Sequence, residues 1–177
     1  MRFHKKRLVV NPEHKVGLIN NIIGSGLFTG YFPFASGTVA SLVACIVFFI
    51  PGINIFILGS IILVFFILGI YSANDMMKKY GSDPHEVVID EFVGMWVSGL
   101  FIVFYFDAAE FDVKILMTGV AFISFRIFDI IKLAPAKYFD KIDSPVGIMM
   151  DDVIAAIYAG IVTFIVNGFI TGYLINQ

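Results

Sequence analysis

The sequence predicts an all-α membrane protein, a polytopic helical bundle with four or five membrane segments. Apolar residues make up 59% of the 177 residues and charged residues only 15%, whereas soluble domains contain roughly 45–50% apolar residues. The mean hydropathy is +0.91, and 20 residues are phenylalanine. Much of the surface is therefore expected to face lipid, and the length predicts a single domain, residues 1–177.

Five apolar segments are candidates for membrane helices, each of which needs about 20 apolar residues to cross the hydrocarbon. Segment 53–71 is the clearest because it contains no charged residue. Segment 39–50 is short and is followed by Pro51 and Gly52, so a tilted or re-entrant piece is expected there. The remaining candidates are 92–106, 115–131 and 153–175.

The basic residues predict how these segments are oriented. Of the 12 lysines and arginines, five lie within residues 2–15, two at 78–79 and four within 126–141. Only Lys114 lies elsewhere, so the basic residues occupy three alternate connecting segments. Cytoplasmic loops carry such an excess of basic residues, and most of the acids lie in or beside the same three segments.

The first part of the chain, residues 1–20, is predicted to be a basic cytoplasmic extension of a helical bundle formed by residues 21–177. Its basic start resembles that of a signal peptide, but the apolar run that follows is brief and no small-residue cleavage site appears. The net charge of −2 argues against a nucleic-acid partner. The single cysteine, Cys45, cannot form an intramolecular disulfide and is expected to be a buried core residue.

Two pairs of neighbouring acids lie beside apolar segments. Asp90 and Glu91 precede one segment, Asp151 and Asp152 precede another, and apolar residues flank both pairs. Ionisable groups at a membrane helix are costly unless they are paired, which favours a functional interpretation. The dipole of a helix N-terminus is the structural alternative. The dipole accounts for one carboxylate in each place and not for two.

A third charged group lies at the inner end of segment 115–131. Arg126, Asp129 and Lys132 are spaced three residues apart, which places them on roughly one face of a helix. Arginine offers a planar fork for phosphate oxygens and lysine a point charge, so both cations are candidates for binding a substrate phosphate. The alternative is that the three charges neutralise one another and anchor the helix at the membrane surface.

Together these groups place five carboxylates at the predicted cytoplasmic face, without clustered cysteine or histidine. Hard oxygen ligands of this kind favour Mg²⁺ over zinc. Phosphoryl transfer suits such a set, because a metal and basic side chains stabilise the charge on the phosphoryl oxygens. The predicted metal ligands and catalytic residues are Asp90, Glu91, Asp129, Asp151 and Asp152.

A glycine-rich stretch, residues 24–41, ends where the first apolar segment begins. Backbone amides of a loop ahead of a helix form a ready anion site, to which Thr38 or Ser41 would add a hydroxyl group. Both residues are therefore candidates for substrate binding. The alternative is a plain turn in which Ser36 or Thr38 caps the helix.

Four blocks of the sequence resemble the phosphatidylglycerophosphatase A family, in the family's order and spacing. The resemblance implies an all-helical fold in the bacterial cytoplasmic membrane and Mg²⁺-dependent hydrolysis of phosphatidylglycerophosphate to phosphatidylglycerol and phosphate. It also implies that the five acids form the site, with Arg126 and Lys132 beside them. The blocks are Gly24–Ser25–Gly26 with Gly37, Thr38 and Ser41; 88–96; 125–132; and 147–152.

Three departures from the family pattern concern loops and leave the acids and bases in place. Ser36 stands where the family usually has proline before Gly–Thr, and residues 133–135 read Leu–Ala–Pro in place of Pro–Trp–Pro. The approach to the paired aspartates, residues 143–147, reads Asp–Ser–Pro–Val–Gly. The chemistry is therefore expected to be retained, while loop geometry and head-group preference are expected to change.

Two other functions compete with a phosphatase. A cation-binding membrane transporter would carry charged or broken helices near the middle of the membrane and often an internal repeat. A lipid phosphotransferase would need a nucleotide-activated donor, for which the sequence shows no motif. The acids gather at one face and no repeat is visible, so the sequence favours a phosphatase.

Overall fold

The computed structural model describes residues 10–105 and 109–175, and every regular element within them is a helix. The all-α prediction is confirmed. Residues 1–9 of the predicted basic N-terminal segment lie outside the described residues. The elements are α1 (Leu18–Gly24), η1 (Thr29–Tyr31), α2 (Ser36–Ala44), η2 (Cys45–Phe49), α3 (Ile55–Tyr80), α4 (Ile89–Leu100), η3 (Val103–Tyr105), α5 (Phe111–Ile131), α6 (Ala136–Phe139) and α7 (Pro145–Ile175), where η marks a 3₁₀ helix.

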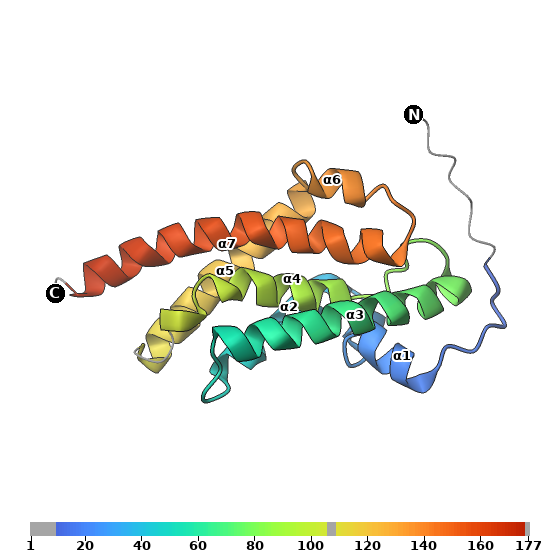
Figure 1. Cartoon of the computed structure of the whole chain (residues 1–177), viewed down its shortest axis with the longest axis horizontal. Helices are drawn as coiled ribbons and strands as arrows, with labels where there is room; N and C mark the ends of the chain where they lie inside the picture. The colour runs from blue at the N-terminus through green and yellow to red at the C-terminus, as the bar shows by residue number, and fades with distance from the viewer. Residues whose placement is uncertain (1–9, 106–108, 176–177) are drawn as a thin grey trace.

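Two long helices, α3 and α7, run along the molecule, and α4 packs against both (Figure 1). Within the described residues, two helical stretches are long and apolar enough to cross a membrane, Ile55–Tyr80 and Pro145–Ile170. α4 has only 12 residues, and the apolar stretch Ser36–Phe49 is also shorter than a full span. Length and composition therefore support two membrane helices, and the number four or five stays a prediction.

Several helix ends differ from the ends of the apolar segments. α3 continues past residue 71 to Tyr80, and α7 begins at Pro145 instead of residue 153. α4 ends at Leu100 instead of residue 106. Hydropathy marks the part of a chain that suits hydrocarbon, whereas a helix continues for as long as its backbone hydrogen bonds and packing allow. The predicted boundaries of these three helices are therefore wrong.

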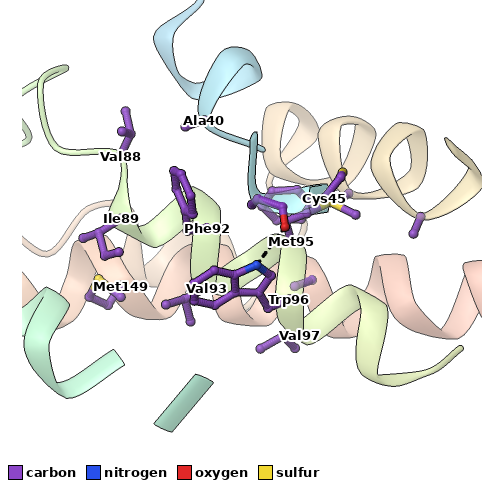
Figure 2. Packing of buried hydrophobic residues seen from close by; sticks show 14 of the residues in the cluster. Ala40, Cys45, Val88, Ile89, Phe92, Val93, Met95, Trp96, Val97 and Met149 are labelled. Atoms are coloured by element: carbon purple, nitrogen blue, oxygen red, sulfur yellow. Dashed lines mark hydrogen bonds between the residues drawn. The ribbon is translucent and has the colours of Figure 1, made fainter. Parts of the chain in front are cut away.

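α4 is buried from Phe92 to Gly99 and forms much of the core. Gly94 lies against the ring of Phe125, at a distance that leaves little room for a Cβ atom. On another side of α4, the indole Nε1 of Trp96 donates a hydrogen bond of 2.9 Å to the carbonyl oxygen of Ala44 (Figure 2). These contacts fix α4 against α5 and α2, so the position of its first turn is well defined.

The glycine-rich stretch forms a packed connection from α1 to α2. The backbone amide of Val88 donates to the carbonyl oxygen of Gly24 at 2.9 Å, which ties the end of α1 to the segment before α4. Gly30 lies directly against the backbone of Glu86, where a Cβ atom would overlap the carbonyl group. These contacts place the N-terminal end of α2 beside the first turn of α4.

Candidate active site

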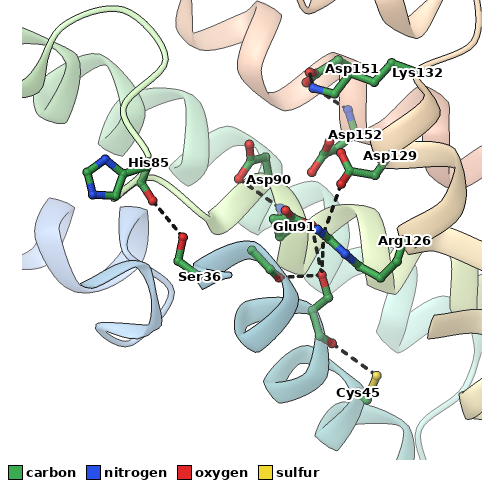
Figure 3. A network of polar contacts seen from close by, with 12 residues as sticks. Ser36, Cys45, His85, Asp90, Glu91, Arg126, Asp129, Lys132, Asp151 and Asp152 are labelled. Atoms are coloured by element: carbon green, nitrogen blue, oxygen red, sulfur yellow. Dashed lines mark hydrogen bonds and ion pairs between the residues drawn. The ribbon is translucent and has the colours of Figure 1, made fainter. Parts of the chain in front are cut away.

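The N-terminal ends of α2 and α4, the C-terminal end of α5 and the first part of α7 meet around a polar pocket of about 170 Å³ (Figure 3). The five acids predicted from the sequence all line it, and so does Lys132. The other lining residues are Ser36, Gly37, Asp83, Pro84, His85, Val87, Val88 and Ile148.

Asp90 and Glu91 occupy the first turn of α4. Asp90 Oδ1 accepts a hydrogen bond of 3.0 Å from the backbone amide of Glu91. Glu91 Oε2 accepts bonds from Arg126 Nη1 at 2.5 Å and from Ser41 Oγ at 3.0 Å. Burial, and then the charges of Glu91 and Asp151, raise the pKa of Asp90 well above its usual value. The ionised form of Asp90 therefore needs a compensating cation.

Arg126 links the acids of two helices. Its Nη1 atom lies 3.1 Å from Asp129 Oδ2, one turn further along α5, as the spacing of three residues predicts. The same atom contacts Glu91 of α4 and lies 3.4 Å from Ser41 Oγ of α2. Arg126 is not among the described residues that line the pocket. Its guanidinium therefore contacts Glu91 and Asp129 without lining the pocket itself.

Lys132 ends α5 with a left-handed backbone conformation, at φ +45°. Its Nζ donates to Asp151 Oδ2 at 2.6 Å and to Asp140 Oδ1 at 2.8 Å. Burial acts to lower the pKa of Lys132, but the bonds to Asp140 and Asp151 and the charge of Asp152 outweigh burial and raise the pKa. Lys132 therefore stays a cation, and it turns toward α7 instead of extending the helical face of α5.

Asp151 and Asp152 lie inside α7, well past its first residue, Pro145. A helix dipole acts on charges within the first turn, so the structural alternative considered for this pair does not apply. Both side chains are buried, with exposed fractions of 5% and 3%. Asp151 pairs with Lys132, whereas no hydrogen-bond donor in the described part of the chain contacts the carboxylate of Asp152.

Three acids from three helices converge closely enough to share a metal ion. One carboxylate oxygen from each of Glu91, Asp129 and Asp152 lies within 4.8 Å of the other two. Six carboxylates line the pocket and Asp140 lies beside it on Lys132, against the two cations of the predicted site, which leaves an excess of negative charge. Buried charges are unfavourable unless they are paired or bound to a metal, and an all-oxygen donor set suits a hard cation. These residues fit Mg²⁺.

The start of α2 contributes to the site through its backbone as well as its side chains. Gly37 lies so close to the Glu91 carboxylate that a Cβ atom would overlap it. Ser41 Oγ donates to Glu91 Oε2 at 3.0 Å. Neither Ser41 nor Thr38 is among the described residues that line the pocket, and their role in substrate binding stays a prediction. The N-cap of α2 is Ala35, and no side chain caps the helix. The alternative prediction of a Ser36 or Thr38 cap is therefore wrong.

Some residues of the site were not predicted from the sequence. Asp140 accepts the second hydrogen bond of Lys132, and Asp83 lines the pocket with φ +55°. Ser36 Oγ donates to the carbonyl oxygen of His85 at 3.2 Å. Asp83 and Asp140 lie in connections between helices, so their positions depend on loop geometry that no sequence spacing indicates.

Known proteins similar to this chain share one activity class. The family model for phosphatidylglycerophosphatase A matches residues 22–167. The chain is 37% identical over 165 residues to phosphatidylglycerophosphatase A of Haemophilus influenzae, covering 89% of this chain and 95% of that protein. It is 30% identical over 175 residues to the Escherichia coli protein of the same name, covering 96% and 93%. A Bacteroides thetaiotaomicron protein provisionally named phosphatidylinositol-3-phosphatase is 34% identical over 144 residues, covering 78% and 87%.

No solved structure matches the chain. The family match spans well over half of the sequence and includes all five acids that line the pocket. Two named relatives align over most of both chains. The chain therefore belongs to the phosphatidylglycerophosphatase A family, whose members are enzymes that hydrolyse the phosphate monoester of a phospholipid.

Proposed function

We propose that this protein hydrolyses the terminal phosphate monoester of phosphatidylglycerophosphate, giving phosphatidylglycerol and phosphate, in a reaction that depends on Mg²⁺. One observation carries the proposal: carboxylate oxygens from α4, α5 and α7 converge within 4.8 Å inside a polar pocket. The family match supports the reaction class, and two relatives bear the name of this activity. The family match gives no support to the alternative function, a cation transporter.

Glu91, Asp129 and Asp152 would hold the ion, with Asp90 and Asp151 close to it on the pocket wall. The bound Mg²⁺ supplies charge neutralisation for the phosphoryl oxygens and makes an acidic pocket attractive to an anion. Arg126 is a positioning residue in this proposal. Its guanidinium holds Glu91 and Asp129 in place and offsets part of their mutual repulsion.

The substrate phosphate is expected to lie between Lys132 and the first turn of α2. Lys132 and Gly37 both line the pocket. The first amide groups of a helix have no partner within the helix, and the positive end of its dipole favours an anion. The free backbone amides at the N-terminal end of α2 would therefore serve as neutral hydrogen-bond donors to the phosphate, in addition to the cation Lys132.

Asp90 is the carboxylate proposed as general base. It lines the pocket, and no cation in the described part of the chain forms an ion pair with it. In the described part of the chain only the Glu91 amide donates to this carboxylate, so an oxygen of Asp90 is available to accept a proton from water. In the proposed step Asp90 takes a proton from water as the water oxygen bonds to phosphorus. The phosphorus–oxygen ester bond breaks, and the released alkoxide of phosphatidylglycerol takes the proton back from Asp90, which regenerates the carboxylate.

We place the site at the cytoplasmic face of a bacterial inner membrane. The two long apolar helices support membrane association, and the basic residues beside the site favour the cytoplasmic side. In this arrangement α5 and the α2–η2 pair complete a bundle of four or five membrane segments. The acyl chains of the substrate stay in the bilayer while its phosphate reaches the pocket.

A second candidate substrate comes from the Bacteroides relative, whose provisional name refers to a phosphoinositide. The departures from the family pattern at 133–135 lie in the connection between α5 and α6, and those at 143–147 span the end of the loop after Asp140 and the first residues of α7. Both candidates present a phosphate monoester on a lipid head group. The assay must therefore compare phosphatidylglycerophosphate with phosphatidylinositol 3-phosphate.

The test is phosphate release by purified protein in detergent micelles, with and without Mg²⁺, for the wild type, Asp90→Asn and Asp112→Asn. Asp112 is an exposed acid in the first turn of α5, at the opposite end from Asp129, and is the matched control. The wild type and Asp112→Asn are expected to release phosphate only with Mg²⁺, and Asp90→Asn to lose nearly all activity. Full activity of Asp90→Asn would remove the assigned base, and absence of release from either lipid would remove the function.

A further inference from the structure

An apolar groove runs along the outside of the molecule between the α2–η2 segment and α5. Its volume is about 300 Å³. Leu42, Ile46 and Ile115 on its edges are exposed, so the groove opens to the surroundings of the bundle. The remaining residues that line it are Cys45, Phe49, Thr118, Gly119 and Phe122.

The groove lies one helical turn from two residues that contact the site. Phe122 lies one turn before Arg126 on α5, and Cys45 lies one turn after Ser41. Cys45 Sγ donates to the carbonyl oxygen of Ser41 at 3.2 Å, and both Ser41 and Arg126 contact Glu91. The α5 residues that line the groove extend from Phe122 to Ile115, about 10 Å at 1.5 Å per residue. The groove and the pocket share no lining residue, so a lipid with its phosphate in the pocket would pass Ser41 and Arg126 to place its hydrocarbon in the groove.

Gly119 keeps the groove open. No heavy atom of a neighbouring residue lies within 4 Å of the place that its Cβ would occupy. Since residues 118, 119 and 122 share one side of α5, a larger side chain at 119 would project into the groove without displacing the core. Part of the volume of the groove therefore exists because residue 119 is a glycine and has no side chain.

A second apolar pocket, of about 340 Å³, lies between α1, α3 and α4. It is lined from α4 by Ile89, Phe92 and Trp96, which share one helical face. Asp90 and Glu91 lie on other faces of α4. α4 itself therefore separates this pocket from the acids.

We propose that the α2–α5 groove binds one acyl chain of the lipid substrate and so aligns the phosphate with the pocket. This inference rests on the proposed function, because it assumes a phospholipid whose head group reaches the acids. A diacyl phospholipid has the required chemistry: an anionic phosphate for the polar end and a flexible hydrocarbon chain for an apolar groove open to the bilayer.

The test fills the groove. Gly119→Leu places a branched apolar side chain in it, and Gly59→Leu is the matched control on α3, where a Cβ atom also meets nothing within 4 Å. Each protein is assayed with dipalmitoyl phosphatidylglycerophosphate and with its deacylated form, glycerophosphoglycerophosphate. The deacylated form carries the same phosphate monoester and has no acyl chain that could enter the groove.

Gly119→Leu is expected to lower kcat/KM for the dipalmitoyl lipid by about tenfold, mainly through KM, while its activity on the deacylated substrate equals that of the wild type on the same substrate. Gly59→Leu is expected to match the wild type on both. Equal loss on both substrates, or no loss on either, would overturn the groove assignment while leaving the phosphatase function in place. Absence of wild-type activity on both substrates would instead remove the proposed function.

A second measurement does not depend on the folding of a variant. The wild-type protein is irradiated with a phosphatidylglycerophosphate that carries a diazirine midway along one acyl chain. Labelling of peptides that contain residues 45–49 or 115–122, reduced by excess unlabelled lipid, is expected. Labelling confined to peptides from α3 or from the outer half of α7 would contradict the proposal.

Discussion

Asp75 and the acids of the pocket have opposite surroundings. Asp75, on α3, is surrounded by donors. Its Oδ1 is 2.8 Å from His14 Nε2, and its Oδ2 accepts bonds from the Gly17 amide at 3.0 Å and from Asn20 Nδ2 at 2.9 Å. Lys78 lies 3.7 Å from the same carboxylate. Asp75 thereby fastens the segment before α1 to α3.

The acids of the pocket have few donors for their number. Glu91 and Asp129 share the single guanidinium of Arg126, and no donor in the described part of the chain contacts the carboxylate of Asp152. Burial of ionised oxygens without partners is strongly unfavourable. Asp75 has a complete structural role, whereas the pocket acids keep lone pairs available for a cation.

The largest expected effect comes from Asp152→Asn. This change keeps the size of the side chain and removes the charge that would bind the ion. We expect phosphate release to fall by about a thousandfold, with an unchanged elution volume in gel filtration and unchanged helix content by circular dichroism. Retention of wild-type activity would show that Asp152 is not needed for the reaction.

Removal of Mg²⁺ is expected to abolish activity reversibly and to lower thermal stability. An ion that binds the folded protein at 100 times its Kd stabilises it by about 2.7 kcal/mol. The measurement is a melting curve in detergent for the wild type with chelator and with added Mg²⁺. The same shift in Asp152→Asn would mean that the ion binds somewhere else.

Substitution of the shared guanidinium is expected to have an intermediate effect. Arg126→Lys keeps the charge but loses the fork that contacts Glu91 and Asp129 together. We expect kcat to fall by about 10- to 100-fold with a smaller change in KM, since Arg126 positions carboxylates and does not line the pocket. A rise in KM alone would indicate that Arg126 binds the substrate directly.

The smallest effect on catalysis is expected at Asp75. Asp75→Asn places an amide nitrogen among the donors of Gly17 and Asn20 and removes the pairing with His14. We expect a loss of about 1–3 kcal/mol in stability and kcat close to wild type. A large loss of kcat, measured at a temperature at which the variant is fully folded, would show that Asp75 does not differ from the acids of the pocket.

The sequence predicted most of the helices and the membership of the acidic cluster. It did so because charged residues flanked by apolar runs are rare in membrane helices and because their positions relative to basic loops indicate a common face. The contact between Arg126 and Asp129 follows from helical spacing alone and is confirmed.

Features that depend on tertiary geometry were not predictable in the same way. Lys132 leaves the helical face because α5 ends there with a positive φ, which no spacing rule indicates. Its pairing with Asp140 depends on the path of the short α6 segment. The placement of Asp151 inside α7 was missed because the two aspartates interrupt the apolar pattern and make it begin at residue 153, although the backbone is helical from Pro145.

The most direct test of the account is Mn²⁺ binding to the purified protein, measured by electron paramagnetic resonance and competed with Mg²⁺. Wild type and Asp75→Asn are predicted to bind Mn²⁺ with equal affinity, while Asp152→Asn loses the tight site. Equal binding by all three proteins, or loss of binding in Asp75→Asn alone, would contradict the claim that Glu91, Asp129 and Asp152 converge to hold a divalent cation.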